Sequence, residues 1–241
     1  MLKNPRVIAS IIFLLLLFAV AMAMGQTAPA QNTKPPDQPQ KVNARPVAIA
    51  SPQASPTASA TASPKSEPFD HATKTEMAGQ CVTLETEIGK IVIEVLPDAA
   101  PETVRNFLNL AATGAYDTTT FSRVVRGFVI QGGQLGTSQR WNEALSARAR
   151  RTIPDEPNFI RHERGIVSMA RSERPRSATT SFFILVDRAP HLDGTFAAFG
   201  RVTSGMDVVD SINNAAVENE RPLNPVRVTH ATVAPCARAS Q

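Results

Sequence analysis

The segment FSRVVRGFVIQGGQ, residues 121–134, contains two short apolar runs on either side of Gly127, and two glycines follow the second run. Such runs, bounded by glycines, predict two short β-strands joined by a turn. Because side chains alternate between the two faces of a strand, Phe121, Arg123 and Val125 are expected on one face. An arginine between apolar neighbours has two explanations. Either its stem packs on the strand while its head group lies in solvent, or the guanidinium serves a function.

Short apolar runs recur through the region after residue 78, separated by segments rich in Gly, Pro, Asn, Asp or Arg. Residues 81–97 alternate apolar and polar side chains around Gly89, which predicts a β-hairpin. Two amphipathic helices are expected, at residues 101–114 and 206–213, because apolar residues recur there at helical spacing. Many short strands with few helices predict a mainly β fold, either a barrel or a sandwich.

The first 25 residues have the pattern of a secretory signal, in which two basic residues precede the apolar run of residues 7–24. An A-x-A motif at residues 21–23 offers a cleavage site, whereas the length of the run also suits a membrane anchor. Residues 1–25 are therefore interpreted as a signal peptide or an N-terminal membrane anchor, and the anchor would leave a tether through residues 7–24. Either way we expect an exported protein, located in the periplasm or cell envelope.

Residues 26–78 consist mainly of Pro, Ala, Ser, Thr and Gln and hold few sizeable apolar side chains. Such a segment cannot bury enough surface to offset the entropy lost on ordering it. We therefore predict a disordered linker over residues 26–78 and one globular domain over residues 79–241. The linker is either a spacer that holds the domain away from a membrane or wall, or a neutral tail.

Charge and motifs exclude several classes of function. The chain of 241 residues has a formal net charge of +4, but its arginines are scattered. Two loose clusters are present, Arg148, Arg150, Arg151 and Arg171, Arg174, Arg176. We interpret both as parts of solvated loops and expect no nucleic-acid partner. The four histidines lack metal-ligand spacing, and the sequence has no P-loop, dinucleotide fingerprint or G-x-S-x-G motif, so neither a metal nor a cofactor is expected.

Two cysteines, Cys81 and Cys236, stand near the two ends of the predicted domain. In an exported protein they would face an oxidising compartment. If the ends of the domain lie on neighbouring strands, a disulfide would close almost the whole domain as one loop, which the chain-entropy model values at roughly 5 kcal/mol. Two unpaired buried thiols are the alternative.

Residues 121–134 resemble the signature of the cyclophilin family of prolyl isomerases, which has the form F-H-R-V-I-x-x-F-M-I-Q-G-G-D. The matching positions are Phe121, Arg123, Val124, Phe128, Ile130, Gln131, Gly132 and Gly133. The blocks S-M-A, F-F-I, L-D-G and F-G-R-V follow at fitting intervals. The resemblance covers residues 81–235, essentially the whole predicted domain.

The resemblance implies a closed eight-stranded antiparallel β-barrel capped by two α-helices. Its first and last strands would be neighbours, which favours the disulfide between Cys81 and Cys236. The implied activity is that of a peptidyl-prolyl cis/trans isomerase that acts on proline-containing polypeptides without a cofactor. In this chain the activity would assist the folding of exported proteins, and we expect a monomer.

The resemblance also implies the site residues. Arg123 would be catalytic, and Gln131 would contact the substrate backbone. The implied substrate-binding residues are Phe128, Val129, Gln131, Ala170, Arg171, Ser181, Phe183, His191, Leu192 and Phe196. Of these, the proline pocket would be formed by Phe128, Val129, Phe183 and Leu192.

Several positions depart from the family pattern. Ser122 stands in place of His, Val129 of Met, Gln134 of Asp, Arg171 of Asn, Ser181 of Gln and His191 of Trp. The Gln that Ser181 replaces helps to hold the substrate peptide, and the Trp that His191 replaces favours binding of cyclosporin. These departures motivate an alternative function, a proline-peptide-binding or chaperone-like module with weak or no catalysis.

Overall fold

The computed structural model describes residues 66–237. The predicted signal or anchor segment, residues 1–25, and most of the predicted linker lie outside these residues. The described part of the chain is mainly β with short helices between the strands, as the sequence predicted. No helix within it is both long and apolar enough to cross a bilayer.

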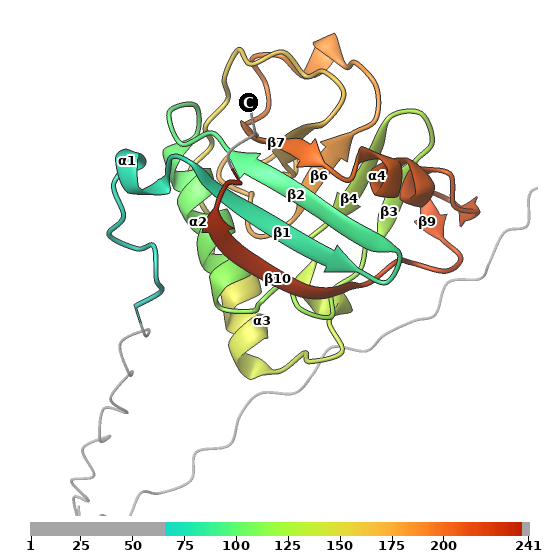
Figure 1. The fold of residues 1–241 in the computed structure, drawn as a ribbon, viewed down its shortest axis with the longest axis horizontal. Helices are drawn as coiled ribbons and strands as arrows, with labels where there is room; N and C mark the ends of the chain where they lie inside the picture. Colours follow the sequence, from blue (N-terminus) through green and yellow to red (C-terminus); the bar gives the residue numbers. More distant parts are fainter. Residues whose placement is uncertain (1–65, 238–241) are drawn as a thin grey trace, which may run out of the picture. The chain divides into compact units, whose positions relative to one another are not determined.

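One antiparallel sheet of eight strands forms the body of the domain (Figure 1). Its strands are β1 (Gln80–Thr86), β2 (Gly89–Val95), β3 (Arg123–Val125), β4 (Val129–Gly132), β5 (Ile166–Met169), β6 (Phe182–Leu185), β7 (Ala198–Ser204) and β10 (Val228–Pro235). They lie side by side in the order β10-β1-β2-β7-β5-β6-β4-β3. The predicted hairpin at residues 81–97 is confirmed as β1 and β2. A separate hairpin, β8 (Val217–Glu218) and β9 (Arg221–Pro222), was not predicted.

Short helices connect the strands. They are α1 (Lys74–Met77), α2 (Pro101–Ala112), α3 (Glu143–Ala149) and α4 (Met206–Asn213), with single 3-10 turns η1 (Leu135–Thr137) and η2 (Pro190–Leu192). The two predicted helices are confirmed as α2 and α4. Pro101 starts α2, where the missing N–H of proline would have had no partner. Figure 1 shows α2 and α4 on opposite sides of β1 and β2; α2 packs against β7 and β10, and α4 against β2, β3 and β4.

Aromatic side chains fill the core between α2 and the sheet. The ring of Phe107 on α2 lies 5.6 Å from Tyr116, 5.3 Å from Phe182 and 4.9 Å from Phe199, measured between ring centres. These four side chains are almost completely buried. Tilted and edge-to-face contacts at these distances are the favourable arrangements of aromatic pairs. The rings therefore support β6 and β7 from the inside.

The predicted closed barrel is not what the structure has. Within the described residues the edge strands β10 and β3 are not paired with each other, so the sheet stays open. Irregular backbone bridges the gap, because the N–H groups of Thr118 and Phe121 donate to the carbonyl oxygens of Val228 and Val226 at 2.8 and 3.0 Å. Thr118 has a φ of 60°, a left-handed conformation that interrupts the extended chain before β3. An isolated antiparallel bridge between Thr120 and Arg227 also crosses the gap, outside the named strands.

A disulfide joins the two ends of the domain. Cys81 at the start of β1 bonds to Cys236, just after β10, with the two Cα atoms 4.9 Å apart. The register of the two strands explains the pairing, since Cys81 lies opposite Ala234 and Gln80 lies opposite Pro235. The predicted pairing is therefore confirmed.

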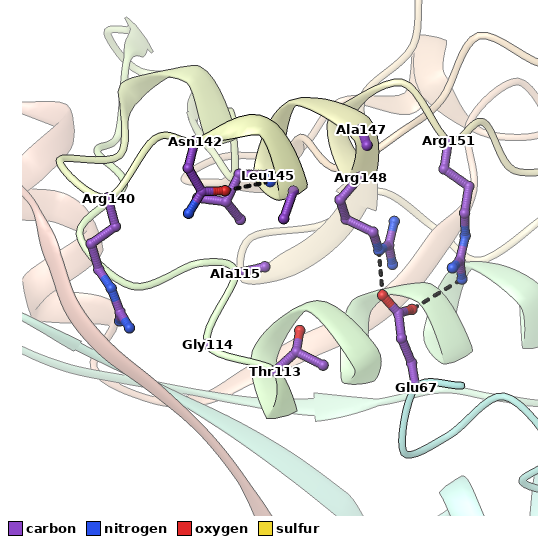
Figure 2. A pocket seen from close by; sticks show the side chains of 11 residues that line it. Glu67, Thr113, Gly114, Ala115, Arg140, Asn142, Leu145, Ala147, Arg148 and Arg151 are labelled. Atoms are coloured by element: carbon purple, nitrogen blue, oxygen red, sulfur yellow. Dashed lines mark hydrogen bonds and ion pairs between the residues drawn. The ribbon is translucent and has the colours of Figure 1, made fainter. Parts of the chain in front are cut away.

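Residues 66–78, which we expected at the end of the disordered linker, pack on the domain and are called here the N-terminal strap. Glu67 of the strap accepts a hydrogen bond from Nε of Arg148 at 2.7 Å (Figure 2). The N–H of Phe69 donates to Oδ1 of Asn109 at 2.7 Å, and Met77 is fully buried. Composition misplaced the linker boundary because the strap is held mainly by such specific polar contacts, with few apolar side chains.

Helix α3 was not predicted, and it corrects the interpretation of one arginine cluster. Its segment carries no apolar periodicity, but Asn142 caps its start by accepting a hydrogen bond from the Leu145 N–H at 2.9 Å. Arg148 lies in this helix rather than in a loop, and its side chain is only 10% exposed. It also donates to Oδ1 of Asn106 at 2.8 Å. The expectation of a solvated Arg148 was wrong.

Candidate active site

Arg123 belongs to a row of side chains that crosses three strands. In the antiparallel register, Arg123 on β3 lies opposite Gln131 on β4, and Gln131 lies opposite Phe183 on β6. Residues paired in this way point to the same face of a sheet. Their neighbours Val124 and Ile130 point the other way and join the core. The row therefore sets a guanidinium, an amide and an aromatic ring side by side.

Phe121 does not share this face. It is fully buried in the same core as Phe182, whereas Val125 packs against a different apolar cluster. Strand alternation does not extend back to Phe121, because β3 begins only at Arg123. The predicted common face of Phe121, Arg123 and Val125 is therefore wrong for Phe121.

A cavity of about 160 Å³ opens at this row. Its lining residues are Arg123, Phe128, Val129, Gln131, Ala170, Arg171, Phe183, Leu192 and Phe196. Each of them was a predicted site residue. The predicted residues Ser181 and His191 are not part of the lining.

The walls of the cavity are mostly apolar, and buried side chains behind them hold them in place. Val129, Phe183 and Leu192 are buried and belong to an apolar cluster that also contains Ile166 and Leu185. The rings of Phe183 and Phe196 meet edge to face, with centres 5.7 Å apart. Support of this kind holds the side chains in place before a ligand arrives.

The guanidinium of Arg123 forms the polar side of the cavity. Its Nε donates to Oε2 of Glu220 at 2.7 Å, and its Nη1 lies 3.5 Å from Oε1 of Gln131. A guanidinium has five N–H donors, so these contacts leave donors for a bound molecule. Glu220 was missed by the sequence analysis, because it lies on the unpredicted hairpin, far along the chain from Arg123.

A second arginine closes the wall at Phe196. The guanidinium carbon of Arg171 lies 5.1 Å from the centre of the Phe196 ring, within range of a cation–π interaction. Arg171 also donates to the carbonyl oxygens of Ser172 and Thr195, both at 3.1 Å. These contacts fix the side chain at the cavity instead of leaving it in solvent as the sequence suggested.

Ser181 and His191 act beside the cavity rather than in it. The carbonyl oxygen of Ser181 accepts from the N–H of Ala170 at 2.9 Å, so this residue holds the neighbouring wall through its backbone. The ring centre of His191 lies 5.6 Å from that of Phe128. The resemblance implied that both residues bind substrate; neither is among the residues that line this cavity.

His162, Ser168 and Asp193 form a hydrogen-bonded chain that the sequence did not reveal, with His162 and Ser168 buried and Asp193 partly exposed. Nδ1 of His162 lies 2.9 Å from Oδ1 of Asp193, and Nε2 lies 2.9 Å from Oγ of Ser168. The order resembles a nucleophilic triad, but Ser168 is completely buried and cannot reach a substrate. The chain instead connects the strand before Ala170 to the turn after Leu192, two walls of the cavity.

The carboxylate of Asp193 is held in its charged form. It accepts hydrogen bonds from the backbone N–H of His162 at 2.8 Å and from the ring of that residue. These bonds lower the pKa of Asp193 below its usual range, the backbone bond most strongly. An ionised Asp193 can only accept, so the hydrogen atom of this contact is on Nδ1 of His162.

Another cavity, of about 550 Å³, lies between the end of α2 and α3 (Figure 2). Its arginines are engaged in ion pairs, since Arg148 and Arg151 contact Glu67 at 2.7 and 3.0 Å, and Arg140 contacts Asp117 at 3.0 Å. Figure 2 shows the guanidinium groups of Arg148, in α3, and Arg151, just after it, both pointing to the carboxylate of Glu67. In residues 66–237 no three His, Cys, Asp or Glu side chains are grouped as a metal site would require.

The geometry of the smaller cavity defines a class of protein. A preformed apolar pocket beside a fixed guanidinium and an amide suits a small apolar ring that is joined to a polar chain. A prolyl residue within a peptide has this shape. Fold and site together are those of a peptide-binding domain of the prolyl isomerase class.

Comparison with known proteins identifies the family. Residues 81–233 match the family described as "Cyclophilin type peptidyl-prolyl cis-trans isomerase/CLD". The chain belongs to this family, and as an enzyme it is a cyclophilin-type peptidyl-prolyl cis-trans isomerase.

Two named relatives match most of the domain. The protein "Peptidyl-prolyl cis-trans isomerase cypE" of Dictyostelium discoideum is 37% identical over 158 residues, which cover 65% of this chain and 99% of that protein. A "Probable peptidyl-prolyl cis-trans isomerase" of Brucella abortus is 36% identical over 159 residues, covering 63% of this chain and 81% of that protein.

Solved structures agree with the fold. A Cryptosporidium parvum cyclophilin type isomerase, crystallised in the presence of the dipeptide Ala-Pro, superposes with a TM-score of 0.56 at 27% identity. The match covers 64% of this chain and 98% of that chain. A cyclophilin from Hirschia baltica, at 24% identity, superposes with a TM-score of 0.54 over 63% of this chain and 73% of its own. The second comparison concerns the fold alone.

Proposed function

We propose that this chain accelerates the cis–trans interconversion of X-Pro bonds in proline-containing polypeptides, and that Arg123 supplies the hydrogen bond that does so. The observation that carries the proposal is the cavity at the β3, β4 and β6 row, where the Arg123 guanidinium borders a largely apolar pocket of about 160 Å³. The Ala-Pro dipeptide used with the Cryptosporidium relative supports the choice of substrate.

The barrier to be lowered is electronic. Rotation about an X-Pro bond costs about 18 to 20 kcal/mol, because the amide C–N bond has partial double-bond character. As the bond twists, conjugation is lost and the prolyl nitrogen gains a lone pair that can accept a hydrogen bond. A donor fixed beside that nitrogen stabilises the twisted state more than the planar states, which is the condition for catalysis.

Magnitudes show that Arg123 cannot act alone. Bringing a process of tens to hundreds of seconds to the millisecond range requires roughly 5.5 to 7 kcal/mol off the barrier. One charge-assisted hydrogen bond contributes about 1.5 to 3 kcal/mol. The apolar pocket and the amide of Gln131 must provide the remainder, by holding the proline ring while the chain before it rotates.

We further propose that the protein works outside the cytoplasm, on exported polypeptides. Two features support this location. One is the secretory pattern of residues 1–25, which lies outside the described residues, and the other is the disulfide between Cys81 and Cys236, which is stable in oxidising compartments. Fractionation of cells that express the full chain, with N-terminal sequencing of the mature protein, tests the location and separates a cleaved signal from a membrane anchor.

The mechanism is tested with Arg123→Ala and Arg123→Lys in a protease-coupled assay on a prolyl peptide. We expect both variants to fold and to lose most of their activity, about 10- to 100-fold in kcat/KM, because Lys lacks the planar array of donors. Arg150→Ala, an exposed arginine at the end of α3, is the matched control and should retain full activity.

The same assay decides between catalysis and the alternative of a binding module. Tight binding of the prolyl peptide by the wild-type protein with no rate enhancement would favour the module. A folded Arg123→Ala variant with wild-type turnover would refute the arginine mechanism.

A further inference from the structure

We infer that Glu220 is a positioning residue that aims the Arg123 guanidinium at the substrate, an inference that rests on the proposed function. Glu220 lies in the turn of the β8–β9 hairpin and makes two contacts with β3. Its Oε2 accepts from Nε of Arg123 at 2.7 Å, and its carbonyl oxygen accepts from the N–H of Val124 at 2.8 Å. Side chain and backbone of one residue are thereby fixed to two successive residues of the strand.

The backbone of the hairpin turn is unusual at this position. Asn219 has a φ of 49° and Glu220 a φ of 65°, both in the left-handed region. Asparagine tolerates this region well, whereas a glutamate there is disfavoured. Residues held in such conformations cluster at functional sites. The strained backbone brings the carboxylate of Glu220 onto Arg123.

Stability alone gives little reason for this pair. The side chains of Arg123 and Glu220 are 41% and 51% exposed, and ion pairs of that exposure add little to folding stability. A long arginine side chain, however, has many rotamers, and only some of them present a donor to the cavity. A carboxylate bound at Nε restricts the plane of the guanidinium and leaves the Nη groups as the donors available to the substrate.

Gln131 supplies a weaker contact on the other side of the guanidinium. Its Oε1 lies 3.5 Å from Nη1 of Arg123, at the limit of a hydrogen bond. Glu220 therefore provides the shorter, charge-assisted contact that orients the group. Because Glu220 does not line the cavity, its removal should affect the transition state more than the binding of the planar substrate.

The test compares Glu220→Ala, Glu220→Gln and the control Glu218→Ala in the full chain. For Glu220→Ala we expect kcat to fall roughly five- to twentyfold while KM changes by less than about twofold, because orientation is lost but the pocket is intact. Glu220→Gln should keep at least about half of kcat, since an amide oxygen still accepts from Nε. Glu218, an exposed acid of the same hairpin that makes no ion pair with Arg123 in the described structure, should be dispensable.

A second readout does not depend on turnover. In wild-type protein the Nε–H proton of Arg123 should exchange slowly and give a distinct NMR signal, and the Glu220→Ala variant should lose both properties while its unfolding midpoint stays unchanged. If Glu220 had a purely structural role, Glu220→Ala would instead shift the unfolding midpoint. It would not lower kcat selectively while leaving KM unchanged.

Three outcomes would overturn the inference. The first is a wild-type kcat in Glu220→Ala. The second is a kcat above the wild-type value in Glu220→Gln. The third is a rise in KM without a fall in kcat in Glu220→Ala. If Arg123→Ala is inactive while Glu220→Ala is fully active, the inference fails and the proposed function stands. If Arg123→Ala itself retains wild-type activity, the proposed mechanism fails.

Discussion

Two arginine–carboxylate pairs on different parts of this domain share one geometry. Nε lies 2.7 Å from a carboxylate oxygen both in Arg148–Glu67, where α3 meets the N-terminal strap, and in Arg123–Glu220, beside the cavity. Their surroundings differ, because the first pair is 10% and 13% exposed and the second is 41% and 51% exposed. The buried pair is part of the domain's packing, whereas the exposed pair leaves the arginine accessible to a substrate.

The difference shows that distance alone does not define the role of an ion pair. Removing one partner of a buried pair leaves an uncompensated charge, which is strongly destabilising. Removing one partner of an exposed pair costs about 0 to 1 kcal/mol, because water replaces it. We therefore expect substitutions on the strap side to change stability, and substitutions on the cavity side to change activity.

The largest stability effect is expected at the disulfide on the strap side of the molecule. Cys81→Ser with Cys236→Ser should lower the free energy of unfolding by about 2 to 5 kcal/mol, because the loop constraint on the unfolded chain is lost. Urea unfolding of the variant, and of wild-type protein with and without reductant, measures the effect. The kcat of the molecules that stay folded should be unchanged, and a selective loss of kcat would contradict the separation between the two sides.

The next effect is expected at the buried pair. Glu67→Ala should lower the free energy of unfolding by about 2 to 3 kcal/mol, because Arg148 would keep its charge in a site that is nine-tenths buried. Urea unfolding again measures it. Glu173→Ala, which removes an exposed acid from a loop, is the control and should change stability by less than about 0.5 kcal/mol.

The contrast with the cavity side makes this prediction sharper. Glu67→Ala should leave kcat and KM unchanged in folded protein, while Glu220→Ala should do the reverse and lower kcat with little change in stability. If Glu67→Ala costs less than about 1 kcal/mol, the strap is only loosely attached and burial of the pair does not matter.

The strands and main helices were predictable from the sequence, because apolar periodicity records burial. The hairpin at residues 81–97 and the helices α2 and α4 all carry that periodicity. Helix α3 and the strap do not, since they are held by polar contacts such as Asn142 to Leu145 and Glu67 to Arg148. Contacts between distant polar residues leave no periodic signal in one sequence.

The candidate site was predicted largely through its resemblance to the cyclophilin signature. That resemblance identified all the residues that line the cavity, but the direction of each side chain depends on where strands begin and loops turn. Ser181 and His191 were predicted to bind substrate but do not line the cavity, and Phe121 was assigned to the face of Arg123 although it is buried in the core. Glu220 was missed because its partner Arg123 lies far along the chain, and His162 because no periodic pattern marks its contacts with Ser168 and Asp193.

The smallest effect is expected on the cavity side, at Asp193, and it depends on pH. Its hydrogen bonds with His162 lower its pKa in the folded protein, so the unfolded chain binds a proton more readily. The stability from these bonds is therefore complete above the unfolded value of about 4 and is lost as the pH falls through the lower folded value. Asp193→Asn cannot titrate, so the difference in unfolding free energy between wild type and variant should shrink as the pH falls from 6 towards 3. Urea unfolding across that range measures it, and a difference that stays constant would show that Asp193 is not held in its charged form by His162.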